Sequence, residues 1–240
     1  MDLLVKCTKP GPTVTNKVMM KAFECLTDIS KMIYEELGPY VHVLVEFSLT
    51  VIQNGTDPCK IPAMEMWNVI AQEFTKRKAL ITNGRQNENP SGLQVNDYIL
   101  PYAKTLLPPI LLNLRQITEE DVTGDYLSVY CAASKCLLSL CEALSDNAIE
   151  ITTDFIKTFI SNDAWTDKAA TLSAFACLIA GISQLQSDNL LTASFGNIMP
   201  MVSNQNFVVR MAAVLLLVQA AKYCKFTLLK DGFLAPYMPG

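Results

Sequence analysis

The sequence predicts an all-α protein, an α-solenoid (superhelix) of about five helical hairpins. Half of the 240 residues are hydrophobic and only 18% are charged, which indicates an extensive buried core. The alternating runs, punctuated by Gly and Pro, that strands need are scarce. Paired alanines recur in three apolar segments, where Ala133, Ala170 and Ala213 are separated by 37 and 43 residues. A period of about 40 residues with two helices per unit is typical of HEAT or armadillo repeats, in which small residues let neighbouring helices approach closely.

The clearest predicted hairpin ends the regular part of the chain. Residues 206–224 (NFVVRMAAVLLLVQAAKYC) have Gln219 as the one polar residue between Arg210 and Lys222, so the apolar surface surrounds the expected helix. Such a helix is expected to be covered on several sides. It is shorter than the roughly 20 residues that a membrane span requires. Residues 189–203 are less apolar, as expected of an outer helix that shields the inner one.

Two preceding hairpins repeat this pattern. Residues 154–177 form an amphipathic helix, a tight polar turn and an alanine-rich helix, and residues 127–144 supply another apolar inner helix. The predicted outer partner of the latter is a long helix over residues 97–114. We expect it to be bent or interrupted at Pro101 and at Pro108-Pro109, because proline lacks the amide hydrogen that a helix interior uses.

The first half of the chain follows the same order. Residues 1–7 are predicted to end an outer helix, and residues 15–36 to form an inner helix. Residues 40–53 contain β-branched residues that would suit a strand, but the surrounding period favours an outer helix. After a turn, residues 61–74 are expected to form the next inner helix.

Two polar stretches interrupt the repeats. Residues 76–94 have the composition of a loop, which we expect to be an insertion between repeats. Residues 118–125 (TEEDVTGD) form an acidic turn, either an ordinary solvated turn with helix-capping acids or a functional one. The predicted repeats are 1–37 (partial), 38–78, 93–145, 147–184, 187–225 and 226–240 (the start of the next). Since solenoids need polar capping repeats and neither end has one, we expect a piece of a longer superhelix.

Charge and cysteine spacing exclude several functions. The net charge of −4 and the pI of about 5.1 leave no basic stripe for nucleic acid, and they suit a basic protein partner. The eight cysteines include no CxxC pair. Cys131, Cys136 and Cys141 are five residues apart, which turns each by about 140° from the last, so they share no helix face. We expect reduced, buried thiols and neither a metal site nor a cofactor.

An enzymatic function is not expected. His42 is the single histidine of the sequence and lies in an apolar segment. No second metal ligand, glycine-rich phosphate loop or nucleophile elbow accompanies it.

The order of motifs resembles the central HEAT-repeat region of importin-β, a nuclear transport receptor of the karyopherin-β family. The run comprises LGPYVHVLVEF (37–47), AMEMWNVIAQEF (63–74), YILPYAKTLLPPILLNL (98–114) and CAASKCLLSLCEAL (131–144). A turn that ends in Trp165 and the segment NIMPMVSNQNFVVRMAAVLLL follow. The acidic turn carries fewer acids than the aspartate-rich loop of the family.

The resemblance implies a receptor that carries protein cargo through nuclear pores and works in the cytoplasm, in the nucleus and at the pore. Phenylalanine-glycine (FG) repeats of nucleoporins would enter an apolar groove between neighbouring outer helices, where one buried ring gives weak, reversible binding. The residues expected to line this groove are Leu3, Leu4, Val43, Leu44 and Phe47. The alternative for each is plain packing within its repeat.

On the inner face, the resemblance implies a site for the basic segment of an importin-α-type adaptor or of a basic cargo. Glu65, Trp67 and Glu73 are the expected contacts, although Trp67 equally suits a packed core. The acidic turn, with Glu119, Glu120, Asp121 and Asp125, is similar to the loop that meets basic cargo or Ran-GTP, which releases the cargo. The alternative function is a HEAT scaffold unrelated to transport, such as a phosphatase-scaffold-like subunit, since fold alone does not decide function.

Overall fold

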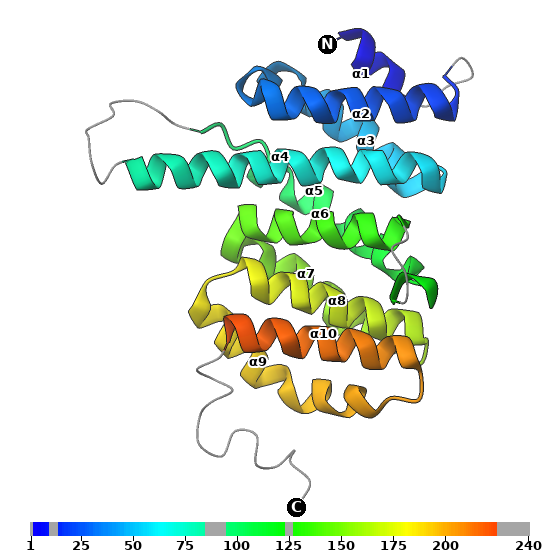
Figure 1. The fold of residues 1–240 in the computed structure, drawn as a ribbon, viewed down its shortest axis with the longest axis vertical. Helices are drawn as coiled ribbons and strands as arrows, with labels where there is room; N and C mark the ends of the chain where they lie inside the picture. The colour runs from blue at the N-terminus through cyan, green and yellow to red at the C-terminus, as the bar shows by residue number, and fades with distance from the viewer. Residues whose placement is uncertain (1, 10–13, 85–94, 123–126, 225–240) are drawn as a thin grey trace, which may run out of the picture.

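A computed structural model describes residues 2–9, 14–84, 95–122 and 127–224, and these form two stacked layers of helices (Figure 1). The inner layer comprises α2 (Asn16–Met32), α4 (Asp57–Gly84), α6 (Val129–Leu144), α8 (Trp165–Gly181) and α10 (Phe207–Tyr223). The outer layer comprises α1 (Asp2–Thr8), α3 (Val41–Asn54), α5 (Ala103–Asn113), α7 (Ile149–Phe159) and α9 (Gln184–Ile198). Each inner helix packs on the next inner helix and on its own outer partner. The predicted all-α solenoid of five hairpins is confirmed.

Polar residues begin the inner helices where the sequence supplies them. The side chains of Thr15, Ser128 and Asn206 accept hydrogen bonds from amides in the first turns of α2, α6 and α10. Short 3-10 helices connect many of the elements: Tyr34–Tyr40, Leu100–Tyr102, Leu114–Gln116, Glu120–Val122, Ser145–Ala148 and Met199–Ser203. Within the described ranges, no helix combines the length and the apolar character needed to cross a membrane.

Small residues bring the inner helices together. Ala133, Ala170 and Ala213 are fully buried, at 0% exposure. Gly181, the last residue of α8, lies so close to α6 that an added Cβ would be 2.4 Å from the carbonyl carbon of Cys141. Buried small side chains at these repeated positions leave room for neighbouring helices to approach closely.

The structure corrects the predicted loop over residues 76–94. The helix α4 continues to Gly84, and it extends beyond its neighbours in Figure 1, while residues 85–94 lie outside the described ranges. Lys, Arg, Ala and Leu in this stretch are good helix formers. The extension is also held by tertiary contacts, because Arg77 lies over the ring of Tyr34, 5.2 Å from its centroid, and pairs with Glu35 at 3.7 Å.

The long outer helix predicted over residues 97–114 is shorter than expected. The carboxylate of Asp97 accepts hydrogen bonds from the amides of Ile99 and Leu100, and a 3-10 turn precedes α5. Pro108 and Pro109 lie inside α5 rather than ending it.

The expectation that residues 206–224 are covered on several sides is wrong. One side of α10 packs on α8 and α9, but Leu215 and Val218 are 51% and 56% exposed, and Phe207 and Val214 are also exposed. Apolar residues on all sides of a helix show that each side could be buried. They do not show which sides the described repeats cover.

Candidate binding sites

A hollow with four acidic residues opens at the edge of the inner layer, where α4 and α6 begin. Its volume is about 850 Å³. Glu24 of α2, Asp57 and Glu65 of α4, and Glu120 of the turn before α6 line it, together with Lys135. We call these four acids and the surface around them the acidic hollow. Apolar side chains also line it: Met20, Ile61, Leu127 and Val129.

Three of the four carboxylates, on α2 and α4, differ in the side chains that they contact. Glu24 pairs with Lys21, and Asp57 lies 3.9 Å from Lys60, so each has a cation one helical turn away. Glu65 is half-buried and accepts a hydrogen bond of 3.1 Å from Asn68. Among the described residues, no cation pairs with Glu65. The acidic hollow therefore presents a partly desolvated carboxylate whose partner is a neutral amide.

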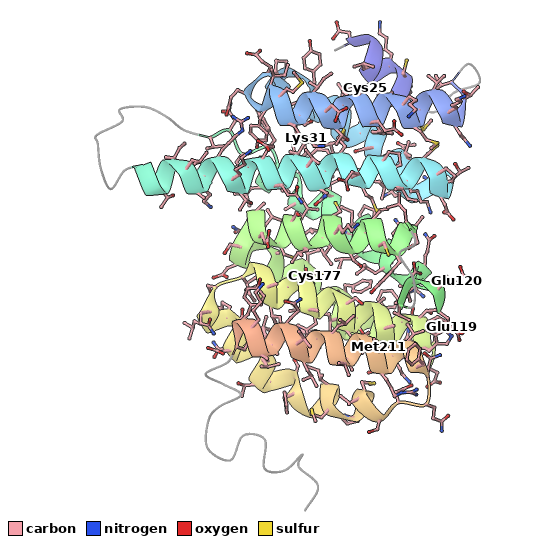
Figure 2. The ribbon with its side chains drawn as sticks, viewed as in Figure 1. Cys25, Lys31, Glu119, Glu120, Cys177 and Met211 are labelled. Atoms are coloured by element: carbon pink, nitrogen blue, oxygen red, sulfur yellow. The ribbon has the colours of Figure 1, made fainter. Side chains whose placement is uncertain are left out.

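The acidic turn divides into two parts. The carboxylate of Asp121 accepts hydrogen bonds from the amide and the hydroxyl of Thr118, at 2.7 and 2.8 Å, so Asp121 stabilises the turn itself. Glu119 and Glu120 are exposed, and Figure 2 shows both at the edge of the stack on the segment before α6. Asp125 lies outside the described residues. The structure thus brings Glu120 into the same hollow as Glu65, two residues that the sequence placed in separate sites.

Trp67 and Glu73 do not join this hollow. Trp67 is fully buried, and its indole N–H donates to the Ser48 hydroxyl of α3 at 2.8 Å, so the prediction that it contacts a ligand is wrong. Glu73 lies two turns further along α4, where it pairs with Lys76 at 3.4 Å and Arg77 at 3.5 Å. Its charge is balanced within its own helix.

The groove predicted between the first two outer helices is only partly formed. Leu44 is 1% exposed, which makes it a core residue rather than a groove wall. Val43 and Phe47 are half-buried, and the Lys9 ammonium lies 5.6 Å from the centre of the Phe47 ring. Leu4 instead lines a hollow of about 380 Å³ between α1 and α2. Leu3 lies in α1, and its side chain is outside the described part of the structure.

A better-formed outer groove, which the sequence did not predict, lies between α5 and α7. Its volume is about 440 Å³. The lining residues are Lys104, Pro108, Leu111, Leu112, Glu150, Ile151, Asp154, Phe155 and Thr158. Leu112 is 48% exposed although it follows the buried Leu111. The sequence carries no signal for this groove, because an exposed leucine and a buried one read alike.

The buried cysteines are poor nucleophiles. Burial raises the pKa of Cys177 to about 12, and burial also raises the pKa of Cys136 and Cys141. These thiols stay protonated at neutral pH. Within the described ranges, the cysteines are free and no cluster of His, Cys, Asp and Glu could hold a metal ion.

Comparisons with known proteins point to one kind of protein. No family model matches the chain. Importin subunit beta-1 of Saccharomyces cerevisiae is 24% identical over 195 residues, which cover 81% of this chain and 22% of the relative. The yeast importin-β Kap95 in complex with Nup1 superposes with a TM-score of 0.89 and 20% identity over 98% of this chain and 26% of Kap95. The resemblance to importin-β is confirmed.

A third comparison agrees with this assignment. Kap95 solved with RanGDP has a TM-score of 0.87 at 20% identity and covers the same shares of both chains. At this identity, the structural likeness shows the fold: the HEAT solenoid of importin-β. The importin-β-like chain spans about a quarter of the structures that it matches.

Proposed function

We propose that this chain is the cargo-binding and pore-binding segment of an importin-β-type nuclear transport receptor. It carries protein cargo between cytoplasm and nucleus, binds a basic segment of an adaptor or cargo on its inner layer, and contacts FG nucleoporins on its outer layer. The observation that carries this proposal is the acidic hollow, with Glu65 half-buried and without a cationic partner among the described residues. The solved complexes of yeast importin-β with Nup1 and with RanGDP support the choice of partners.

The chemistry of the acidic hollow suits a segment that combines cations with an aliphatic side chain. A Lys or Arg near Glu65 would give this carboxylate a charge-assisted hydrogen bond in a partly desolvated site. Met20, Ile61 and Leu127 offer apolar surface to a side chain or to the stem of a lysine.

The direct test is a titration of the chain with a lysine- and arginine-rich peptide, followed by fluorescence anisotropy at several salt concentrations. Glu65→Gln and Glu120→Gln should each weaken binding about five-fold, as expected for the loss of an interaction of about 1 kcal/mol. Binding should also weaken with salt. Glu142→Gln is the matched control, because Glu142 is exposed on α6 and does not line the acidic hollow. Equal effects of all three variants would show a non-specific charge effect and contradict the proposal.

The outer groove between α5 and α7 is the proposed nucleoporin site. It has the size to admit a phenylalanine ring, and Leu111, Leu112, Ile151 and Phe155 offer apolar contacts. A second proposed site is the predicted surface around Val43 and Phe47, where an entering ring would have to displace Lys9 from the Phe47 ring.

Titration with an FxFG peptide, monitored by NMR, separates these two sites. Leu112→Ala should abolish the weak, saturable binding if the α5–α7 groove is used, whereas Phe47→Ala should abolish it if the first surface is used. The same peptide with Phe replaced by Ser is the control. Binding that depends on neither residue would remove both surfaces from the proposal.

Release by Ran-GTP is proposed to act through Glu119 and Glu120. Both lie on the exposed part of the acidic turn, and Glu120 lines the acidic hollow, so a partner bound to the turn would compete with a basic segment. Ran-GTP added to the peptide complex should displace the labelled peptide, and Glu119→Gln together with Glu120→Gln should weaken this displacement. Displacement that is equally efficient with Ran-GDP would contradict this role.

A further inference from the structure

A polar network with two buried members connects the acidic hollow to the interface between two repeats. Asn68 of α4 and Ser139 of α6 are each 5% exposed, and the Ser139 hydroxyl donates to the side-chain oxygen of Asn68 at 2.7 Å. Gln72 donates to the same oxygen at 3.1 Å and to the Ser139 hydroxyl at 3.4 Å. Asn68 and Gln72 belong to α4 and Ser139 to α6, two helices that lie side by side in the inner layer (Figure 1).

The network fixes the orientation of the Asn68 amide. An amide oxygen has two lone pairs, and here both are used by Ser139 and Gln72. Rotating the amide by half a turn would place its NH2 group against the NH2 group of Gln72. The nitrogen of Asn68 must therefore face the carboxylate of Glu65, to which it donates at 3.1 Å.

We infer that Asn68, oriented by Ser139 and Gln72, is a positioning residue that holds the Glu65 carboxylate in place for a basic ligand. This inference rests on the proposed function of the acidic hollow. Its consequence is that the affinity of the hollow depends on how α6 sits on α4. A shift of α6 that separates Ser139 from Asn68 would remove one of the two hydrogen bonds that orient the amide, so the amide and the Glu65 carboxylate would be held less firmly.

A double-mutant cycle on the whole chain tests this coupling. The basic peptide is titrated into the wild type, Glu65→Gln, Asn68→Leu and the double variant. Leu branches at Cγ as Asn does and needs no hydrogen bond. Glu65→Gln and Asn68→Leu should each weaken binding about five-fold, and the double variant should be no weaker than Glu65→Gln. A merely structural role of Asn68 would give additive losses instead.

Ser139→Ala and Ser48→Ala form a matched pair of hydroxyl deletions. Both hydroxyls are buried partners of α4 side chains, but Ser48 bonds to Trp67 on the outer side of α4 and is not connected to Glu65. Ser139→Ala should weaken peptide binding about two- to three-fold, and Ser48→Ala should leave the dissociation constant unchanged.

The outcomes separate the inference from the proposed function. Additive losses in the cycle, with the peptide still bound at Glu65, overturn the role of Asn68 and leave the proposed function standing. No binding by a folded wild type overturns both. Equal losses from Ser139→Ala and Ser48→Ala overturn the coupling across the α4–α6 interface.

Discussion

The interfaces on the two sides of α6 are built differently. Between α6 and α8, backbone meets backbone at Gly181, and the Tyr130 hydroxyl is 2.8 Å from that of Ser173. Between α4 and α6, the buried hydrogen bonds run through side chains, and the acidic hollow opens at one end of the contact.

Further contacts hold both ends of α8 in place. At the start of α8, Arg115 forms an ion pair with the buried Asp167, and the guanidinium lies 4.3 Å from the centre of the Phe159 ring. At its end, Asp146 accepts hydrogen bonds from the amide and the hydroxyl of Ser183, at 2.8 and 2.9 Å. A contact between backbones cannot shift without overlap, whereas side-chain hydrogen bonds can open one at a time. The comparison indicates a fixed interface beside an adjustable one.

The largest expected effect comes from a methyl group at Gly181. Its Cβ would lie 2.4 Å from the Cys141 carbonyl carbon and 2.6 Å from the Glu142 nitrogen, so the helices themselves must separate. We expect Gly181→Ala to lower the free energy of unfolding by about 3 kcal/mol, measured by urea denaturation. Gly38→Ala is the control, because its Cβ would meet the tip of the Tyr98 side chain at 3.3 Å. Similar losses of stability in Gly181→Ala and Gly38→Ala would show that the α6–α8 backbone contact is no tighter than an ordinary side-chain contact.

Removal of Arg115 should have the next largest effect. Asp167 has only 3% of its side chain exposed, and Arg115→Leu leaves this carboxylate with Asn162 as its remaining side-chain donor. We expect a loss of about 2 kcal/mol in the free energy of unfolding, by the same measurement. Lys157→Leu should change it by less than about 0.5 kcal/mol, because the Lys157–Asp154 pair is exposed. An equal loss of stability in Arg115→Leu and Lys157→Leu would show that the buried ion pair contributes no more than the exposed one.

Acid should weaken the ion pair between Arg115 and Asp167 at the start of α8. Burial alone would raise the pKa of Asp167, but hydrogen bonds from Arg115 and Asn162 outweigh it and lower the pKa below its ordinary value of 3.8. A carboxyl whose pKa is lowered by folding adds stability above the unfolded pKa, and this stability is lost as the pH falls through the folded pKa. The stability difference between the wild type and Asp167→Asn should therefore shrink below about pH 4. A stability difference that does not change with pH would contradict the lowered pKa of Asp167.

The smallest expected effects compare the two interfaces directly. Tyr130→Phe removes the hydroxyl that bonds to Ser173 across the α6–α8 interface, and Ser139→Ala removes the hydroxyl that bonds to Asn68 and Gln72 across the α4–α6 interface. Each should cost about 1 kcal/mol. Amide hydrogen exchange should accelerate more in α4 for Ser139→Ala than in α8 for Tyr130→Phe, because the backbone contact at Gly181 remains. Equal acceleration on both sides would show that the interfaces are alike.

The sequence predicted the hairpins because their apolar periodicity and paired alanines are local signals. The same signals could not show where α4 ends, because its extension depends on Tyr34 and Glu35, about 40 residues earlier in the chain. The exposed side of α10 was missed for a related reason, since a residue such as Val218 reads as apolar whether or not another repeat covers it.

The candidate site could be predicted only in part. Glu65 and Glu120 were selected as acids on the inner side, but their meeting in one hollow depends on the stacking of α4 against the turn before α6. Trp67 has the same surroundings in the sequence as Glu65, yet it points to Ser48 and the outer layer. Two residues, about half a turn of helix, separate a binding direction from a core direction, and only the packing of the two layers decides between them.

Because α4 is long, a small tilt at the α4–α6 interface would move its far end by a measurable distance. Its 28 residues make a rod about 42 Å long, so a tilt of about 6° around its middle would move each end by about 2 Å. The acidic hollow lies at the first end of this lever, and the exposed Leu80 lies near the other. A ligand that pulls the first end inward would swing the far end outward, and a fluorophore near Leu80 would report occupancy of the hollow from a distance.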